Sequence, residues 1–253
     1  MGRRGVSVAE QRRWIFNRLA AEYRRRPPYP EELVEGLARL APSRGSVADL
    51  GAGIGHLAIP LAQRNFRVAA VEPAQPMLEE LKRRAGAEKV QLEALLATAE
   101  QSNLAAAAWD LVLLADVLQW VDPELAGREA ARLVRPSGMI AVVESQLGGT
   151  PFHRELQALF ARLNPRARTR RPAVRQFLAL AADGSPSVAH FEQEVQLDRE
   201  SLASIIRSLS FVGPALGPAQ VKYVLDEAIR LGELHGGASF RRELTLTWAR
   251  ASH

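Results

Sequence analysis

The chain has 253 residues, of which 47% are hydrophobic and 24% charged, and its formal net charge is +5. These values are typical of a globular protein with one large domain. The sequence contains no run of about 18 apolar residues, so it predicts no membrane span. It contains no cysteine, which excludes disulfides and cysteine-ligated metals. Residues 1–14 lack the apolar core of a signal peptide, so we expect a cytoplasmic protein.

Basic residues gather in two segments of the chain. Residues 1–30 and residues 151–175 each carry a net charge of +6, while the remainder carries −7. This pattern predicts attraction of an anionic substrate or RNA, or else it marks a solvated surface in an arginine-rich protein. No aromatic residue interleaves with the arginines of 162–171, so a surface that stacks nucleic-acid bases is not expected.

The chain begins with two predicted helices and a strand. Val8–Arg26 has apolar residues at helical spacing and is followed by three prolines within four residues. Glu31–Leu40 repeats the helical spacing, and Ser46–Leu50 is an apolar run typical of a buried parallel strand.

Three glycines at alternate positions follow this strand, and a helical stretch begins at His56. Glycine allows a sharp turn and a close approach of a ligand to the backbone. The free N–H groups of a helix start suit polar or anionic ligand atoms. Pro60 lies inside that helix, where we expect a local distortion.

The second strand, Phe66–Val71, ends in Glu72. A carboxylate at the tip of this strand can accept hydrogen bonds from both hydroxyls of a ribose. Together with the glycine loop, Glu72 therefore predicts a nucleoside cofactor.

Strands and helices then alternate at the spacing of βαβ units. The remaining elements predicted for the first half are a helix from Pro76, strands at Val90–Glu93 and Trp109–Leu114, a helix at Pro123–Leu133 and a strand at Met139–Val143. The second half adds helices at Pro151–Leu163 and Pro172–Ala182, an alternating segment at Val188–Leu197, a helix capped by Asp198 through Ser208, a helix at Pro218–Leu234 and a last strand at Arg241–Ala249.

The motif at Asp49–Gly55 distinguishes between nucleoside cofactors. Dinucleotide-binding folds carry G-x-G-x-x-G, whereas this chain has D-x-G-x-G-x-G. In this it resembles the class I S-adenosylmethionine-dependent methyltransferases. The alternative is a Rossmann-like domain that binds another nucleotide or has lost its ligand.

The resemblance extends from Tyr23 to Ala249 and is closest to the type 11 small-molecule methyltransferases that include trans-aconitate methyltransferase-like proteins. It rests on YRRRPPYP, DLGAGIG, VAAVEP, TAE, LLADVLQWVDP, LVRPSGMIAVVE and LTLTWAR. It implies an α/β, Rossmann-like fold: a seven-stranded, mostly parallel sheet with helices on both faces, an antiparallel last strand and a helical cap. We expect a helical lid at 1–45, the cofactor-binding core at 46–150, the cap at 151–187, and strands and helices completing the sheet at 188–253.

The resemblance also implies a cofactor site for S-adenosyl-L-methionine. Gly51 and Gly53 would lie against its methionine part, Glu72 would bind the ribose diol, and Ala115 would lie beside the sulfonium. The other residues implied are Tyr23, Asp49, Ala52, Pro73, Met77, and Ala99 or Glu100 at the adenine amino group. Among these residues, Met77 is equally consistent with core packing. Gly55, the third glycine of the motif, is expected to serve helix packing alone.

The acceptor side departs from the family. Many relatives have His-Trp after the fourth strand, but this chain has Gln119 and Trp120. Glutamine cannot accept a proton, so any general base has been lost or moved, and Gln119 is expected to orient the acceptor by hydrogen bonding. We expect Tyr29 beside the transferred methyl, and Arg26, Trp120 and Glu144 at the substrate.

The sequence therefore predicts methylation of a small molecule at O, N or C, by in-line transfer and without a metal. The substrate is an anion if the basic segments serve to attract it. One alternative is a methyltransferase acting on RNA or on an acyl group bound to a carrier protein. The other is a non-catalytic cofactor-binding protein. The sequence names neither the acceptor nor the oligomeric state.

Overall fold

The computed structural model describes residues 16, 17, 19–165 and 173–251. Seven strands form one sheet in the order β3-β2-β1-β4-β5-β7-β6. The strands are β1 Ser46–Leu50, β2 Arg67–Val71, β3 Glu93–Leu95, β4 Trp109–Ala115, β5 Val134–Gly148, β6 Ala182–Leu197 and β7 Ala238–Ala251. The helices are α2 Ala20–Tyr23, α3 Glu31–Ala38, α4 Ala58–Gln63, α5 Gln75–Ala87, α6 Pro123–Leu133, α7 Pro151–Leu163, α8 Val174–Ala181, α9 Arg199–Ser208 and α10 Pro218–Leu234.

The sheet confirms the predicted fold class. β3, β2, β1, β4 and β5 are parallel neighbours, whereas β7 is antiparallel to β5 and to β6. The chain leaves β1 at the centre of the sheet, so the glycine loop lies at the carboxyl edge where the strand order reverses. Ligands of open parallel sheets bind at this position. Among the described residues, no helix is long and apolar enough to cross a membrane.

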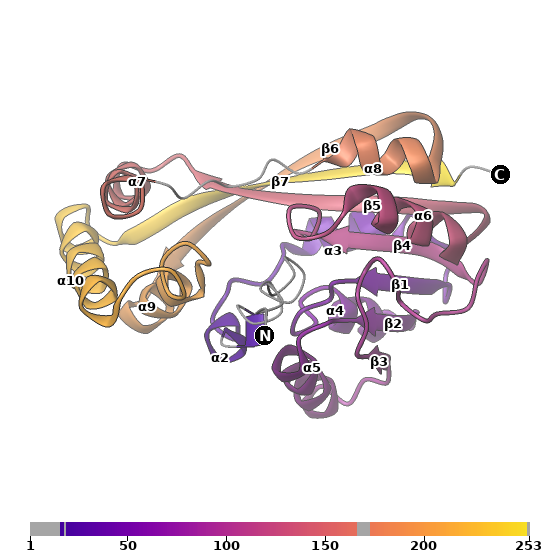
Figure 1. Ribbon diagram of the computed structural model, residues 1–253, viewed down its shortest axis with the longest axis horizontal. Coiled ribbons are helices and arrows are strands. Elements are labelled where there is room, and N and C mark those ends of the chain that lie inside the picture. Colours follow the sequence, from indigo (N-terminus) through magenta and orange to yellow (C-terminus); the bar gives the residue numbers. More distant parts are fainter. Residues whose placement is uncertain (1–15, 18, 166–172, 252–253) are drawn as a thin grey trace, which may run out of the picture.

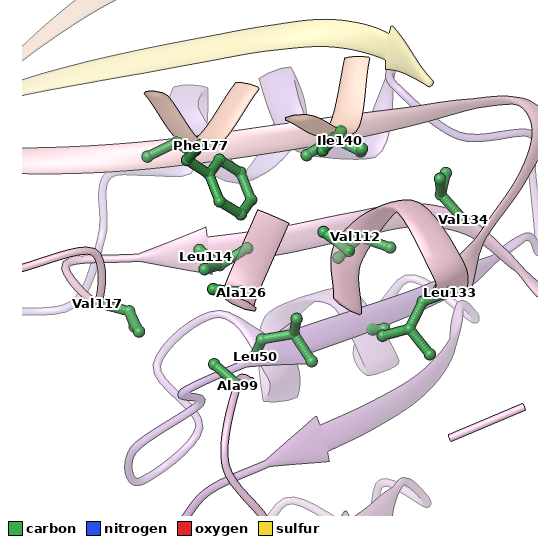
Figure 2. Close-up of a cluster of buried hydrophobic side chains, with 14 of the residues drawn as sticks. Leu50, Ala99, Val112, Leu114, Val117, Ala126, Leu133, Val134, Ile140 and Phe177 are labelled. Atoms are coloured by element: carbon green, nitrogen blue, oxygen red, sulfur yellow. The ribbon is translucent and has the colours of Figure 1, made fainter. Parts of the chain in front are cut away.

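Alternate residues of the strands supply two separate cores. Ala48, Val112 and Ile140 face α6 and α8, while Val47, Leu111 and Ala141 face the side covered by α3 and α4. Figure 2 shows the first of these cores, in which Phe177 of α8 packs near Ala126 of α6 and Leu114 of β4. Burial on both faces explains why these strands are continuous apolar runs.

A long antiparallel ribbon leaves the sheet and carries a second lobe. β5 and β7 stay paired from Met139–Arg250 to Gly148–Arg241, well beyond the end of β4. At the far end of this ribbon α7, α9 and α10 form their own hydrophobic cluster, including Phe152, Ile206 and Leu231 (Figure 1). A smaller cluster of Val195, Ile205 and Phe240 joins α9 to the ribbon.

Several predicted boundaries were wrong. α4 begins at Ala58 rather than His56, so Pro60 lies in its first turn, where a missing N–H costs no hydrogen bond and no distortion is needed. β3 begins at Glu93, where the predicted strand ended. β5, β6 and β7 are each longer than expected, because the ribbon continues them past the sheet. Of the predicted helix Val8–Arg26, residues 8–15 and 18 lie outside the described residues, and the described part forms a helix at Ala20–Tyr23, α2.

The two helices predicted for the cap lie in different places. α7 belongs to the far lobe, whereas Phe177 and Leu178 of α8 pack into the core beside α6. Within the proposed cap, α8 therefore covers a face of the sheet rather than the cleft.

Candidate active site

The glycine loop after β1 is fastened to the neighbouring strand. The backbone N–H groups of Gly51 and Ala52 both donate to the carbonyl of Val71, at 2.7 and 3.0 Å. Gly51 has φ +83°, and a Cβ at this position would lie 2.5 Å from Cγ2 of Val117. A glycine is therefore required here both for the turn and for packing.

Gly53 and Glu72 form the open part of this edge. Gly53 has φ +57°, and no atom lies within 4 Å of the place that a Cβ would take. Its N–H donates to Oε2 of Glu72 at 2.9 Å, and the N–H of Ala74 donates to Oε1 at 2.9 Å. Each carboxylate oxygen thus has one partner and can accept a second hydrogen bond. Gly55 differs, since a Cβ there would meet Ile59 and Leu81, which fits its expected packing role.

Two buried carboxylates lie side by side at the ends of β1 and β2. Burial raises the pKa of Glu72 to about 7, although the N–H groups of Ala74 and Gly53 oppose the shift. Burial and the charge of Glu72 raise the pKa of Asp49 to about 7, against a hydrogen bond from Ala58. Both side chains are therefore poised to change charge near neutral pH.

A small apolar cluster covers the far side of the loop. Leu19 packs with Ile54, Ala74 and Met77, and Tyr23 lies against them. Met77 is 1% exposed, so it is a packed member of this cluster. Tyr23 is partly buried in this cluster, and loss of solvent around its hydroxyl raises the pKa of Tyr23.

Three other predicted cofactor residues lie near the same edge. Pro73 is half-buried after β2, and Ala99 is buried in the core beneath α6. Glu100 accepts a hydrogen bond from the backbone N–H of Asp122 at 3.1 Å, so its side chain also fixes the start of α6.

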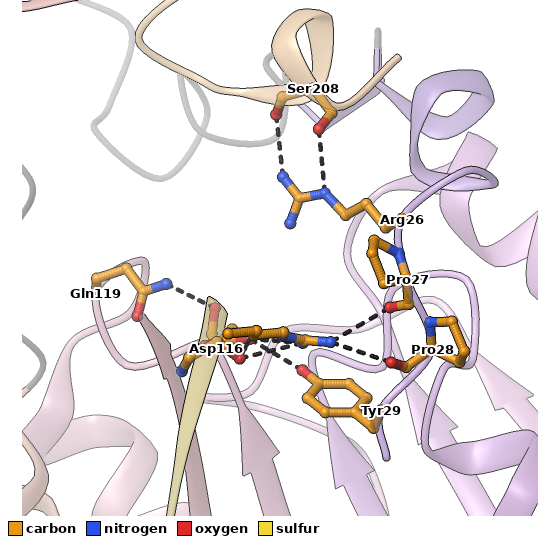
Figure 3. A network of polar contacts seen from close by, with 9 residues as sticks. Arg26, Pro27, Pro28, Tyr29, Asp116, Gln119 and Ser208 are labelled. Carbon is orange, nitrogen blue, oxygen red and sulfur yellow. Dashed lines mark hydrogen bonds and ion pairs between the residues drawn. The ribbon is translucent and has the colours of Figure 1, made fainter. Parts of the chain in front are cut away.

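Tyr29 belongs to a polar network that the sequence did not reveal. Its hydroxyl donates to Oδ2 of Asp116 at 3.0 Å, and the N–H of Ser145 donates to Oδ1 at 2.7 Å. Oγ of Ser145 also donates to Oδ2, at 2.8 Å. Arg242 lies 3.9 Å from Asp116, stacks on the ring of Tyr29 and donates to the carbonyls of Pro27 and Pro28. Figure 3 shows these segments converging on Asp116.

This network shapes the end of β4. Asp116 has φ +54°, a left-handed conformation that Asp tolerates better than most residues. Burial, followed by the charge of Asp116, raises the pKa of Tyr29 well above its ordinary value. Tyr29 therefore stays protonated and donates. Ala115, the last residue of β4, pairs with Val143 beside this network.

Gln119 and Trp120 follow Asp116 in a short turn. Nε2 of Gln119 donates to the carbonyl of Asp116 at 2.8 Å, which directs the amide back onto its own turn (Figure 3). Trp120 makes an edge contact with Phe16, with ring centroids 4.9 Å apart. The indole thus packs against the N-terminal segment.

The two predicted substrate charges, Arg26 and Glu144, are both partly buried. Nε and Nη2 of Arg26 donate to Oγ and the carbonyl of Ser208 in α9, at 3.1 and 3.2 Å, and the guanidinium stacks 3.8 Å from the ring of Tyr23. Glu144 is half-buried just beyond the part of β5 that pairs with β4. Burial and the charge of Asp116 raise its pKa.

His56, for which the sequence predicts no catalytic role, lies near enough to three arginines for their charges to affect it. Burial and the charges of Arg84, Arg26 and Arg242 lower the pKa of His56 to about 3. Its imidazole is therefore neutral, and this side of the loop is electropositive.

A comparison with known protein families gives a match over the glycine loop and the strands around it. Residues 48–142 match the family model of the methyltransferase domain. The matched segment runs from β1 into β5 and includes Asp49, the glycines, Glu72 and Gln119.

Three relatives extend the comparison. An uncharacterized methyltransferase of Mycobacterium tuberculosis is 42% identical over 125 residues, which is 49% of each chain, so the protein spans about half the length of this relative. The malonyl-[acyl-carrier protein] O-methyltransferase of Salmonella typhimurium is 26% identical over 78% of this chain and 77% of its own. The structure of phosphoethanolamine N-methyltransferase 2 of Haemonchus contortus, solved with phosphomonomethylethanolamine and S-adenosylhomocysteine, has a TM-score of 0.56 at 13% identity over 96% of this chain and 60% of its own. At this identity the last match concerns the fold.

Proposed function

We propose that the protein is an S-adenosylmethionine-dependent methyltransferase that acts on a small-molecule acceptor. The observation that carries the proposal is the cradle formed by Gly53 and Glu72. The space beside Gly53 admits a ligand, and Glu72 retains an acceptor position on each carboxylate oxygen. A ribose diol matches this arrangement, because two neighbouring hydroxyls can donate to the two oxygens of one carboxylate.

The residues fit an adenosyl cofactor along the whole edge. Gly51, Ala52 and Asp49 would border its methionine part, Pro73 its adenine, and the segment of Ala99 and Glu100 the adenine amino group. Met77, which is packed in the apolar cluster, would support the adenine wall from behind. Tyr23 would cover it, and Ala115 would face the reacting end. When bound, S-adenosylmethionine supplies a methyl group on a sulfonium.

The chain's own residues would then align the acceptor. Tyr29, fixed by Asp116, and Gln119, through a side-chain oxygen that accepts no hydrogen bond from the described residues, would orient it, with Trp120 as an apolar wall. Arg26 would bind an anionic group of the substrate, since no carboxylate pairs with it among the described residues. Glu144, whose pKa is raised, would take a proton from the acceptor. Alignment and exclusion of water supply most of the acceleration expected for methyl transfer.

Titration calorimetry with S-adenosylmethionine, S-adenosylhomocysteine and NAD tests the cofactor. We expect the two adenosyl sulfur compounds to bind and NAD not to bind. Glu72→Ala should weaken binding by about tenfold or more, because a charge-assisted hydrogen bond is lost. Glu79→Ala, an exposed glutamate of α5, is the matched control. Unchanged affinity in Glu72→Ala would refute the assignment of this carboxylate.

A second candidate is methylation of an acyl group on a carrier protein. It is favoured by the match to the malonyl-[acyl-carrier protein] O-methyltransferase over 78% of this chain. Binding to an acidic carrier protein that weakens steeply with salt would support it. The narrower resemblance to the trans-aconitate methyltransferase-like proteins stays a proposal, as does a cytoplasmic location.

A further inference from the structure

The opposite edge of the sheet holds an open cavity that the proposed reaction does not use. A cavity of about 610 Å³ lies where the connections into β1, β2 and β3 meet. It is lined by Arg44, Asn65, Arg67 and Lys89, with amide side chains of Gln63 and Gln91. A second cavity of about 330 Å³ adjoins it and shares Arg44 and Phe66. Both lie at the amino ends of the parallel strands, far from Glu72 at their carboxyl ends.

Three cations line the larger cavity without a carboxylate partner among the described residues. Arg44 and Lys89 are exposed and have no ion pair there. Arg67 stacks 4.5 Å above the ring of Trp109, and its Nη2 donates only to the carbonyl of Ala108, at 3.4 Å. The single carboxylate of this lining, Glu88, accepts from Gln63 at 3.3 Å.

The ends of the neighbouring helices account for only part of this charge. α3, α4 and α5 end at this edge, and the carboxyl ends of helices attract cations. Arg39 and Arg64 fit that explanation, and they also pair with Glu35 and Glu31. Arg44, Arg67 and Lys89 have no such pairing.

The backbone at this edge gives a second, independent observation. Arg44, Asn65 and Lys89 have φ of +60°, +65° and +55°, one in each of the three connections. Glycine and, to a lesser degree, asparagine adopt this conformation at little cost, so only Arg44 and Lys89 hold it against a conformational preference. Backbone outliers that cluster in one cavity point to a role for the side chains.

The strand order places these side chains in a row. β1, β2 and β3 are neighbours, and adjacent strands lie about 4.8 Å apart, so the three connections cover about 10 Å of the sheet edge. We propose that this cavity binds an oligophosphate anion through Arg44, Arg67 and Lys89. The amides of Gln63, Asn65 and Gln91 would supply further hydrogen-bond donors. The described lining offers no exposed aromatic ring, which favours recognition of the phosphates rather than of a base.

The test uses tripolyphosphate as the probe, in titration calorimetry of the full chain at low salt. Because arginines elsewhere also attract phosphate, the decisive comparison is with the double variant Arg44→Gly, Lys89→Gly. We expect this variant to bind tripolyphosphate about tenfold more weakly or worse, since two charge-assisted contacts are lost. Its melting temperature should be unchanged or higher, because glycine relieves the positive φ at both positions. Lys222→Gln, which removes a cation from α10, should bind as the parent does.

Three results would overturn the proposal. The first is no saturable binding of tripolyphosphate by the parent protein. The second is equal affinity in the glycine variant. The third is tighter binding of an RNA octanucleotide than of tripolyphosphate at the same salt concentration, which would assign the surface to nucleic acid. Binding of S-adenosylhomocysteine should be the same in all variants, so the outcome is independent of the proposed methyltransferase activity.

Discussion

At the scale of single residues, the neighbouring carboxyl groups of Asp49 and Glu72 make ligand binding depend on pH. The pKa of each is about 7. In the folded protein both groups therefore keep their protons at pH values at which the same groups of an unfolded chain have already lost them. Between the unfolded and folded pKa values the native state binds more protons. The contribution of these groups to the free energy of unfolding is therefore present at acid pH and falls as the pH rises through 7.

The affinity for an adenosyl ligand should change with pH in the opposite direction to stability: it should rise as the pH rises. Only an ionised Glu72 accepts hydrogen bonds from both ribose hydroxyls, and a group with a pKa of about 7 is about one tenth ionised at pH 6 and nine tenths at pH 8. We therefore expect the affinity for S-adenosylhomocysteine to rise about tenfold over this interval, measured by titration calorimetry. Glu72→Gln should bind weakly at both pH values, and Glu79→Gln should follow the parent. Affinity that falls with rising pH would contradict this prediction.

Asp116 should matter more than its place in the sequence suggests. Asn tolerates a positive φ as Asp does, so Asp116→Asn alters the hydrogen bonds with little backbone cost. It leaves one acceptor oxygen for the three donors of Tyr29 and Ser145 and removes the carboxylate nearest to the largely buried Arg242, so we expect a loss of about 2 kcal/mol in the free energy of unfolding. Urea denaturation measures this value. Tyr29→Phe, which deletes only one hydrogen bond of the network, should cost about 1 kcal/mol. Equal effects of the two variants would contradict the assigned roles.

The sequence predicted some of these residues and not others for a physical reason. Gly51, Gly53 and Glu72 form one local unit, a strand tip and a turn, so their spacing in the sequence already indicates their geometry. Asp116 follows β4, whereas Ser145 lies on β5 and Arg242 on β7, so the three meet only because β5 lies between β4 and β7. No local pattern records such a meeting.

At the scale of elements, strands whose ends are marked by a local apolar pattern were predicted well, and strands whose length depends on a distant partner were not. β1 and β4 are buried on both faces, so their apolar runs mark their ends. β6 is an edge strand whose residues are mostly exposed, and β5 continues past Val143 only because β7 pairs with it. The hydrophobic pattern cannot mark the length of a strand that is held by backbone pairing rather than by burial.

The short helix α2 and the residues after it form a strap between the two lobes. Arg24 pairs with Glu80 of α5 at 2.8 Å, while Glu22 and Arg26 bond to Ser204 and Ser208 of α9. This strap carries Tyr23 over the Gly53 and Glu72 cradle, so its opening would release a cofactor. The strap has four helical residues and no side-chain cap, so it depends on these contacts rather than on its own helix.

Ser208→Ala should therefore loosen the strap selectively. The change removes the acceptor of Nε of Arg26, and we expect faster amide hydrogen exchange in residues 19–29 and faster dissociation of S-adenosylhomocysteine. Exchange in β1 and β4 should not change. Ser210→Ala, two residues further along, is the matched control, because no hydrogen bond of its side chain joins it to the described residues of the strap. Unchanged exchange in Ser208→Ala would show that the apolar contacts of Leu19 and Tyr23 hold the strap alone.

At the scale of the whole molecule, the ribbon of β5, β7 and β6 joins two bodies with separate cores. One core lies between the sheet and its helices, and the other lies among α7, α9 and α10 (Figure 1). Glu72 and the glycine loop belong to the first body, whereas Ser208, which holds Arg26, belongs to the second. Cofactor binding and acceptor binding should therefore respond differently to damage in the two cores.

Two phenylalanine substitutions separate these responses. Phe240→Ala empties the small cluster that joins α9 to the ribbon, and Phe177→Ala empties the core under α6; each should cost about 3 kcal/mol in the free energy of unfolding. Because the damage in Phe240→Ala lies in the far lobe, that variant should bind S-adenosylhomocysteine within about twofold of the parent while exchange in α9 and the strap rises. Phe177→Ala should instead weaken the binding of S-adenosylhomocysteine, since Ala99 and Val117 belong to the same core as Phe177. Titration calorimetry and hydrogen exchange on both variants measure the two effects, and equal losses of ligand affinity would show that the ribbon transmits strain between the lobes as one rigid body.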